Sequence, residues 1–256
     1  MSAILKLDHI AYSYYSDTGE VKVMDNMDFT IENGSFTAIV GPSGCGKSTI
    51  LSLIAGLLKP TDGFITLYSN DFAAPKIGYM LQHDHLLEWR DIYHNVILGL
   101  EIQHKLTNES LALVDELLEK YNLSHTKALL PSELSGGMRQ RIALIRTLTL
   151  KPDLLLLDEP FSALDYQTRL LVSQDVHRII KSENKTAILV THDIAEAISM
   201  ADHVLLLSKA PCQVKLSIPI EFEKHGISRE TVRDSKLFQD YFDLIWGELQ
   251  NENTEK

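Results

Sequence analysis

Short runs of hydrophobic residues recur along the chain and alternate with longer amphipathic stretches. Runs continuous enough to be strands buried on both faces occupy residues 36–40, 153–158, 186–191 and 203–208. A further apolar strand is expected at residues 77–81. Helices are expected at residues 48–58 and 164–182. This alternation of buried strands and helices predicts a parallel sheet with helices on its faces.

Other regions follow different patterns. Residues 4–9 and 24–31 are short and half-polar, which favours an antiparallel sheet covering one side of the core. Residues 91–150 are helical in pattern and are expected to form an inserted helical lobe. The apolar positions at helix spacing in this lobe include Leu111, Val114, Leu117, Leu118 and Tyr121.

The C-terminal region also repeats hydrophobic residues at helical spacing. The residues concerned are Phe238, Tyr241, Phe242, Ile245, Trp246 and Leu249. They predict an amphipathic helix that packs back on the body of the protein. A surface for a partner is the alternative, and the pattern alone does not separate the two.

Composition and charge narrow the class of protein. The chain has 256 residues, enough for one domain with an inserted lobe or for two small domains. Its net charge of −11 argues against a nucleic-acid surface, which usually has a basic patch. No apolar run approaches the ~18 residues that span a bilayer and no leader is found, so a cytoplasmic protein is expected. Cys45 and Cys212 show no metal-ligand spacing and are expected to be reduced thiols.

A glycine-rich segment follows the first apolar run and matches the phosphate-binding pattern G-x-x-x-x-G-K-[ST]. Its residues are Gly41, Pro42, Ser43, Gly44, Cys45, Gly46, Lys47, Ser48 and Thr49. In this pattern backbone N–H groups approach the phosphates, Lys47 neutralises them and Ser48 ligates Mg²⁺. The predicted strand before it and helix after it put the phosphate at a helix N-terminus, where an anion is favoured. ATP and Mg²⁺ are therefore the expected ligands.

Two carboxylates, Asp158 and Glu159, close the second apolar run. One interpretation is that they merely end a buried strand. The four leucines before them favour a different one, in which Asp158 holds Mg²⁺ through water and Glu159 lies beside the γ-phosphate. Phosphoryl transfer requires charge neutralisation and water positioning, so Lys47, Mg²⁺ and Glu159 suffice as the core of a mechanism.

A second glycine-containing helix start lies at residues 134–141, which read LSGGMRQR. Ser135, Gly136 and Gly137 are expected to expose another set of backbone N–H groups. One chain does not need two phosphate cradles for one ATP, so this segment calls for a separate explanation. The alternative is that Ser135 is an ordinary helix N-cap.

The ordered set of these motifs resembles the nucleotide-binding subunit of an ABC transporter over roughly residues 4–210. The resemblance implies an α/β fold of the P-loop NTPase type, with a RecA-like parallel core, an N-terminal antiparallel β subdomain and an inserted helical subdomain. One ABC transporter domain is expected over about residues 4–235. The implied parts are residues 1–90 and 151–220 for the ATPase core, 91–150 for the helical signature subdomain and 221–256 for a helical extension.

The resemblance also assigns residues to the nucleotide site. Two copies are expected to close head to tail, with the Ser135 cradle of one serving the ATP of its partner. Glu159 matches the residue that polarises the attacking water, and Gln82 matches the Q-loop glutamine that senses Mg²⁺ and water. His192 matches the switch histidine that contacts the γ-phosphate. Asp165 matches the loop that communicates across the dimer, and it also fits an ordinary N-cap.

Two further assignments concern Tyr14 and Cys45. Tyr14 lies where the family stacks an aromatic ring on adenine, although Tyr12 and Tyr15 are close in sequence. Cys45 lies inside the phosphate loop, so nucleotide is expected to shield its thiol from alkylation.

Residues 83–85, a His-Asp-His sequence, invite a metal-site interpretation. We reject it because the family uses this segment to meet the membrane partner, and adjacent residues of a loop point in different directions.

Residues 78–91 are similar to the nitrate, sulfonate and taurine group of bacterial importers, which includes carriers of thiamine-precursor pyrimidines. Glu88 stands where that group typically has a proline. The implied function is the ATP-hydrolysing subunit of an importer, an ABC-type translocase on the cytoplasmic face of the membrane. It would act as a homodimer under a transmembrane permease fed by an extracytoplasmic substrate-binding protein. An exporter motor and a soluble ABC ATPase without a transport role are the alternatives, and no nucleic-acid partner is expected.

Overall fold

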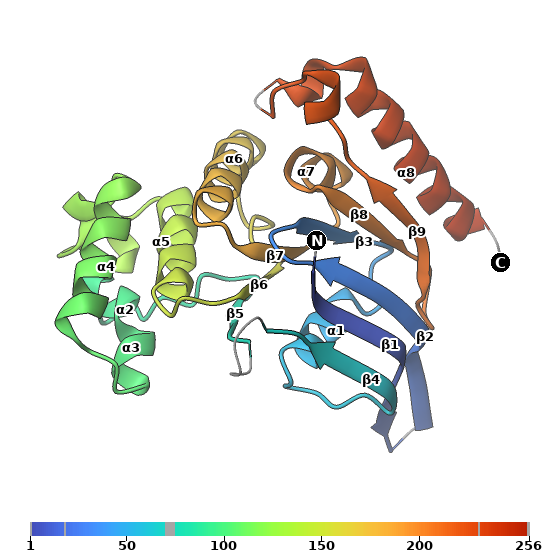
Figure 1. Cartoon of the computed structure of the whole chain (residues 1–256), viewed down its shortest axis with the longest axis horizontal. Coiled ribbons are helices and arrows are strands. Elements are labelled where there is room, and N and C mark those ends of the chain that lie inside the picture. Colours follow the sequence, from blue (N-terminus) through green and yellow to red (C-terminus); the bar gives the residue numbers. More distant parts are fainter. Residues whose placement is uncertain (1, 18, 70–74, 230, 255–256) are drawn as a thin grey trace. The chain divides into compact units, whose positions relative to one another are not determined.

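The computed structural model describes residues 2–17, 19–69, 75–229 and 231–254. The chain forms two compact units, whose elements are labelled in Figure 1. The first unit consists of Met1–Pro75 and Thr186–Lys256, and the second consists of Lys76–Lys185. The second unit is therefore an insertion between two segments that fold together.

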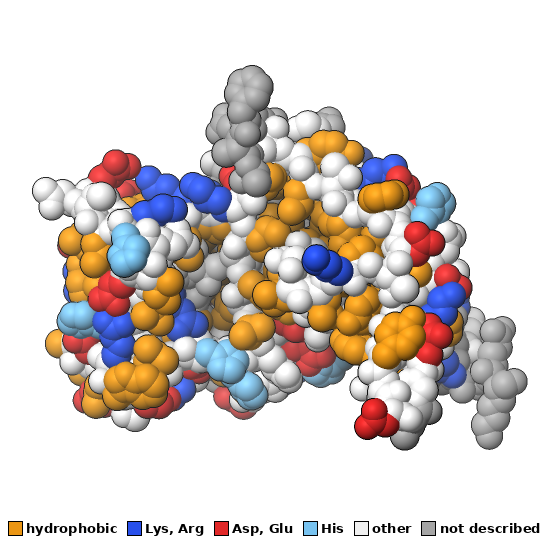
Figure 2. Space-filling view, turned by 90° about the horizontal axis from the view of Figure 1, so that it is seen from below, with side chains coloured by type: hydrophobic (Ala, Val, Ile, Leu, Met, Phe, Trp, Pro, Cys, Tyr) orange, Lys and Arg blue, Asp and Glu red, His pale blue; other side chains and the backbone are white. Residues whose placement is uncertain are grey.

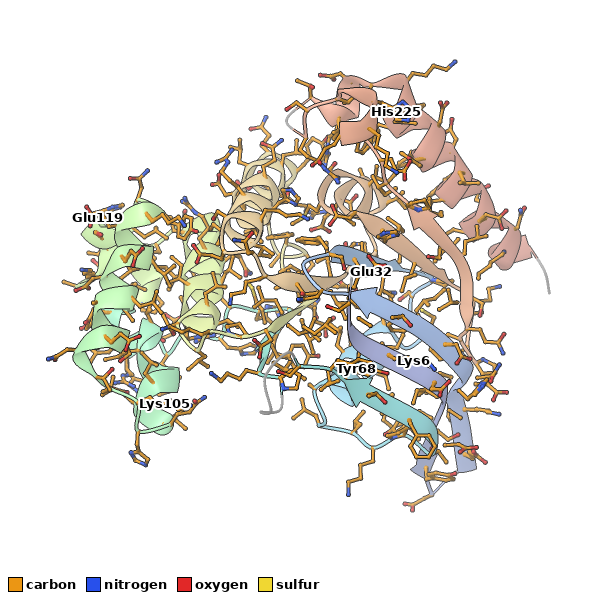
Figure 3. The ribbon with its side chains drawn as sticks, viewed as in Figure 1. Lys6, Glu32, Tyr68, Lys105, Glu119 and His225 are labelled. Atoms are coloured by element: carbon orange, nitrogen blue, oxygen red, sulfur yellow. The ribbon has the colours of Figure 1, made fainter. Side chains whose placement is uncertain are left out.

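A three-stranded antiparallel sheet lies in the first unit, with strand order β2-β1-β4. Its strands are β1 (Ala3–Ser16), β2 (Gly19–Glu32) and β4 (Asp62–Leu67). Lys6 on β1 and Glu32 at the end of β2 are labelled in Figure 3. The predicted strands at 4–9 and 24–31 exist but are too short, because β1 and β2 each run for 14 residues. Their far halves, residues 11–16 and 19–23, form a mostly exposed ribbon, in which Ser13 and Val23 are the buried residues, so burial leaves little apolar signal there.

The first unit also contains the parallel strands expected from the continuous apolar runs. They are β3 (Phe36–Val40), β7 (Thr186–Val190) and β8 (His203–Leu207). β3 pairs in parallel with both of the others, and all five of its residues are buried. β9 (Val214–Pro219), which was not predicted, pairs antiparallel with β8. The three predicted strands are confirmed to within one residue at each end.

The main helices of the first unit are α1 (Lys47–Ile54), α7 (Ile194–Met200) and α8 (Lys236–Thr254). Short 3₁₀ helices occupy Glu223–His225 and Val232–Asp234. The predicted end of α1 at residue 58 is wrong. Gly56 adopts a left-handed φ of 72°, while the amides of Gly56 and Leu57 bond back to the carbonyls of Leu53 and Ser52. This arrangement is a Schellman cap, which ends an α-helix.

The second unit contains a parallel strand pair and five α-helices. The strands are β5 (Ile77–Met80) and β6 (Leu154–Asp158). The helices are α2 (Ile92–Val96), α3 (Leu98–Ile102), α4 (Asn108–Lys120), α5 (Gly136–Leu148) and α6 (Tyr166–Ser182), with 3₁₀ turns at Ser124–Thr126 and Pro131–Glu133. Lys105, just before α4, and Glu119, near its end, are labelled in Figure 3. The predicted helical pattern in α4 is confirmed, since Val114, Leu117 and Leu118 are its buried residues.

The C-terminal helix α8 packs on the first unit through part of its predicted apolar face. Ile245 is fully buried and Phe238 is 8% exposed. The Phe242 ring stacks on that of Trp246, which remains 50% exposed. Hydrophobic side chains also reach the surface elsewhere, as the face drawn in Figure 2 shows. Within the described part of the chain, no helix combines the length and apolarity needed to cross a membrane.

We expect Ile245→Ala to destabilise the chain by about 2–5 kcal/mol, because it leaves a cavity where α8 meets the body of the first unit. Leu244→Ala is the matched control, since Leu244 is 47% exposed on the same helix. Its cost should be within about 0.5 kcal/mol. Urea unfolding followed by circular dichroism measures both. Equal losses for the two variants would contradict the packing of α8 described above.

Candidate nucleotide-binding site

The glycine-rich loop joins the end of β3 to the start of α1 in the first unit, as the phosphate-binding pattern requires. Gly44 and Gly46 have left-handed φ angles of 74° and 109°. At Gly46 a Cβ atom would lie 2.5 Å from Cγ1 of Val23, so both its conformation and its surroundings exclude a larger residue. The loop thus turns sharply and leads directly into the N-terminus of α1.

Lys47 is the first residue of α1 and is only 7% exposed. Its ammonium donates hydrogen bonds to the carbonyl oxygens of Gly41 and Pro42, each at 2.9 Å. A buried ammonium needs such partners, because burial without them is costly. The positive charge is therefore held inside the curve of the loop, where an anionic phosphate would be neutralised.

Tyr14 lies near the first turn of α1, and its hydroxyl is 3.2 Å from Oγ1 of Thr49. The ring is 45% exposed and meets Tyr12 edge-on, with centroids 4.9 Å apart. Tyr15 is 69% exposed, and its hydroxyl donates to Glu20 instead. Tyr14 is thus an exposed aromatic ring tied directly to the phosphate loop.

The side chain of Cys45 is buried by the first unit itself, at 1% exposure. Burial raises the pKa of its thiol, and Lys47 partly offsets that rise. Burial likewise raises the pKa of Cys212 to about 12, with a further contribution from Cys45. Both thiols are free, as expected. The expectation that nucleotide shields Cys45 changes accordingly, because the protein itself already covers the thiol.

His192 follows β7 and is exposed, in the first unit. The turn that carries it is fixed by groups that the sequence did not single out. The Thr191 hydroxyl donates to the Glu196 carboxylate, and the Asp193 amide donates to Oγ1 of Thr191 at 3.0 Å. Asp193 also caps α7 by accepting from the amide of Glu196. This network fixes the backbone on which His192 sits.

Asp158 and Glu159 lie at the end of β6 in the second unit. Asp158 is 8% exposed, and the Tyr79 hydroxyl donates to its carboxylate at 3.3 Å. Glu159 adopts a left-handed φ of 43°. Left-handed backbone is unfavourable for residues other than glycine and gathers at functional sites. The conformation also occurs at seven other described residues that are not glycine, so what it shows here is backbone strain directly after β6.

Gln82 approaches the same strand end through Ser162. Its Nε2 donates to the Ser162 hydroxyl at 3.3 Å, and that hydroxyl donates to the Glu159 carbonyl at 3.0 Å. Tyr79 and Ser162 were both missed by sequence reasoning. Each is an isolated hydroxyl residue, and neither belongs to the motifs that single out Asp158 and Glu159.

Ser135 caps α5, since its hydroxyl accepts from the Met138 amide at 3.3 Å. The N-cap interpretation is therefore correct, and it is compatible with a ligand-binding role for this helix start. At Gly137 a Cβ atom would lie 2.6 Å from Cγ2 of Val172, so glycine lets α5 approach α6 closely. Asp165 caps α6 by accepting from the Thr168 amide at 3.1 Å. Hydrogen bonds from Thr168 lower the pKa of its carboxylate.

The segment around His83 and His85 does not gather ligands around Asp84, whose carboxylate binds Arg139. Among the described residues, one group with metal-ligand chemistry is found elsewhere, at Asp8, His9 and Asp28. Two of these three are exposed, and exposed acidic groups commonly cluster without an ion.

The predicted site residues thus divide between the two units. The first unit carries Tyr14, residues 41–49 and His192, and the second carries Gln82, residues 135–137, Asp158, Glu159 and Asp165. A glycine loop that links a buried parallel strand to a helix, with its lysine inside the loop, defines a P-loop nucleoside-triphosphate-binding protein. The chain belongs to the ABC transporter family, which matches residues 24–162, more than half of its length.

Curated relatives agree with this membership. The chain is 44% identical over 251 residues to the uncharacterized ABC transporter ATP-binding protein YtlC of Bacillus subtilis (strain 168), covering 97% of this chain and 96% of that protein. It is 40% identical over 239 residues to the aliphatic sulfonates import ATP-binding protein SsuB 1 of Rhodococcus jostii (strain RHA1), covering 93% and 91%. The resemblance to the sulfonate group of importers is thus confirmed.

A solved structure has the same fold. It is the dimeric post-hydrolysis state of the ATP-binding cassette MJ0796 bound to ADP and Pi, at 29% identity and a TM-score of 0.70. The match covers 85% of this chain and 99% of that one. The predicted fold class, a P-loop NTPase with an antiparallel β subdomain, is confirmed.

In the native chain we expect iodoacetamide to label Cys45 slowly, whether or not MgATP is present. The reactive species is the thiolate, which burial and a raised pKa both disfavour. Mass spectrometry of peptides after timed labelling at pH 8 measures the rate, and urea-unfolded protein is the fast control. Rapid labelling in the native chain that MgATP suppresses would contradict the buried placement.

Proposed function

We propose that this ABC ATP-binding subunit hydrolyses ATP to drive import of a small organic solute of the sulfonate or taurine kind. The observation that carries the ATPase is the buried Lys47 ammonium held inside the loop between β3 and α1. Import is supported by the similarity to a relative named for aliphatic sulfonate import. The solute itself would be selected by a permease and a binding protein, which are separate chains.

In this proposal the first unit binds the nucleotide. Tyr14 stacks on the adenine, since its exposed ring is tied to the first turn of α1. The N–H groups of residues 41–49 surround the phosphates, and Lys47 neutralises their charge. His192, on the turn fixed by Thr191, contacts the γ-phosphate.

The Mg²⁺ site would combine Ser48 with Gln82 and Asp158. Hydroxyl, amide and carboxylate oxygens suit this hard cation, and the nearly buried Asp158 carboxylate at a strand end fits such a site. When bound, Mg²⁺ supplies further positive charge toward the phosphates. Tyr79 orients the Asp158 carboxylate through its hydrogen bond.

Glu159 polarises the attacking water in the proposed reaction. Phosphoryl transfer depends on positioned charge and a positioned water, so a single carboxylate at this place suffices as the water-directing group. Ser162 links its carbonyl to Gln82, and this fixes the backbone beside both side chains. Hydrolysis therefore needs Lys47, Glu159 and the metal together.

We further propose that two copies close head to tail around two ATP molecules. The N–H groups of residues 135–137 would then face the γ-phosphate held by the partner, and Asp165 would lie near the contact between the copies. A dimer with bound nucleotide is known for the related cassette MJ0796.

The permease would dock on the second unit. A groove of about 220 Å³ is lined there by apolar residues that include Leu98, Ile102 and Leu150. Ile102, which lines the groove, is 70% exposed. Trp89, within the residues 78–91 that are similar to the importer group, is 78% exposed. Large exposed apolar side chains are typical of a protein-binding surface. Docking of this kind would place the chain peripherally on the cytoplasmic face of the membrane.

We expect Glu159→Gln to retain ATP binding and to lower kcat by about 10²–10⁴-fold, because it removes the group that directs the attacking water. The trapped ATP should hold two copies together. Size-exclusion chromatography with light scattering, run with and without MgATP, measures the dimer. An ATP-bound monomer together with normal turnover would count against the shared site.

Lys47→Ala should behave differently from Glu159→Gln. Loss of the ammonium removes the charge that neutralises the phosphates, so ATP binding should weaken by at least about tenfold. A fluorescent ATP analogue titrated against both variants measures this. Unchanged binding in Lys47→Ala, with intact circular dichroism, would refute the assignment of the loop.

A further inference from the structure

Glu88, the residue that replaces the proline of the importer group, is held by an arginine of the signature helix. Nη2 of Arg139 on α5 donates to Oε1 of Glu88 at 2.8 Å. The same guanidinium binds Asp84, with Nε to Oδ2 at 2.9 Å and Nη2 to Oδ1 at 3.2 Å. We call residues 83–90 the permease-facing segment. One arginine therefore binds both carboxylates of this segment.

A second arginine of α5 binds the same segment through its backbone. Arg146 donates to the carbonyl oxygens of Asp84 at 2.6 Å and His85 at 2.8 Å. Arg139 and Arg146 are seven residues apart, about two helical turns, so their side chains leave α5 on the same side. The permease-facing segment is thus attached to one face of the signature helix at two places.

These contacts exceed an ordinary surface ion pair. Asp84 has a side-chain exposure of 16% and Arg139 one of 27%. Desolvation by itself would raise the pKa of Asp84, yet hydrogen bonds from Arg139 and the Leu86 amide, together with the charges of Arg139 and Arg146, outweigh it and the pKa is lowered. Two-pronged arginine–carboxylate pairs hold geometry as well as charge. Asp84 also accepts the Leu86 amide at 3.0 Å, so that the guanidinium fixes the internal turn of the segment.

Arg139 is also joined directly to the start of α5. Its backbone amide donates to the Ser135 carbonyl at 3.0 Å, in the first turn of the helix. One residue therefore bonds the N-terminus of the signature helix through its backbone and the permease-facing segment through its side chain. A displacement of that segment would therefore reach Ser135 through the Arg139 side chain and one backbone hydrogen bond.

We propose that Arg139 is a positioning residue that ties the permease-facing segment to the signature helix through Asp84 and Glu88. In this chain the ionic tie to Glu88 replaces the stiffness that a proline gives the importer group at this position. The role in transmitting movement between a permease and the shared ATP rests on the function proposed above. The tie itself is a property of the isolated chain.

Amide hydrogen exchange of the isolated chain tests the tie directly. In Arg139→Met, exchange at the Leu86 amide should accelerate at least about fivefold, because Asp84 loses the group that fixes it. Arg139→Lys should give a smaller acceleration, since it keeps the charge without the two-pronged geometry. Arg178→Met is the matched control: Arg178 pairs with Asp175 on α6, and its side chain is 64% exposed. Amides of α6 report any general loss of stability.

The fluorescence of Trp89 tests whether the tie transmits the effect of bound ATP to the permease-facing segment. In a Trp246→Phe background, which leaves Trp89 as the single tryptophan, MgATP added to Glu159→Gln protein should change the Trp89 emission. Arg139→Met should reduce that change at least about threefold while ATP affinity stays within about twofold. Arg178→Met should leave it intact.

Either of two results would overturn the proposal. The first is Leu86 exchange in Arg139→Met that equals the parent, or that rises only together with the amides of α6. The second is a Trp89 signal that fails to respond to bound ATP in the parent or is unaffected by Arg139→Met. Failure to bind a fluorescent ATP analogue would instead refute the proposed ATPase, and the exchange result would still decide the tie.

Discussion

A lysine ammonium buried inside a curve of its own backbone is the constraint on which the first unit depends. Lys47 can be covered only because the carbonyls of Gly41 and Pro42 accept hydrogen bonds from its ammonium. That geometry requires the loop to double back on itself, and this in turn requires left-handed backbone at Gly44 and Gly46. The loop must also start at a fixed point, which the fully buried β3 supplies between its two parallel neighbours. The buried strand, the two glycines and the lysine therefore depend on one another.

In the second unit, the backbone is constrained by close helix packing and not by a buried charge. Glycine at position 137 lets α5 approach Val172 of α6, and the Ser135 hydroxyl satisfies the exposed start of α5. The same helix then uses its arginines to hold a neighbouring loop. Hydrogen bonds from Ser162 and Tyr79 arrange the end of β6 in a similar way. These hydrogen bonds thus fix the backbone beside the polar side chains to which the proposed function assigns the chemistry.

Much of the fold could be predicted from sequence because burial leaves a strong local signal. Strands buried on both faces, such as β3 and β6, read as unbroken apolar runs and were located to within a residue. The outer halves of β1 and β2 gave no such signal, since exposed pairing tolerates many residue types. The end of α1 at Gly56 was missed because glycine marks a helix end only in the context of its hydrogen bonds. The side of the loop on which Cys45 lies, and the partners of Arg139, depend on tertiary contacts that no local motif records.

The left-handed backbone of Glu159 joins two properties at one residue. A residue with a Cβ in that conformation costs about 1–3 kcal/mol, a strain that glycine largely avoids. Under the proposed function the same residue carries the carboxylate that directs the attacking water. A glycine at this position would therefore relieve strain and remove the carboxylate at once, so that loss of hydrolysis and gain of stability would come from one substitution.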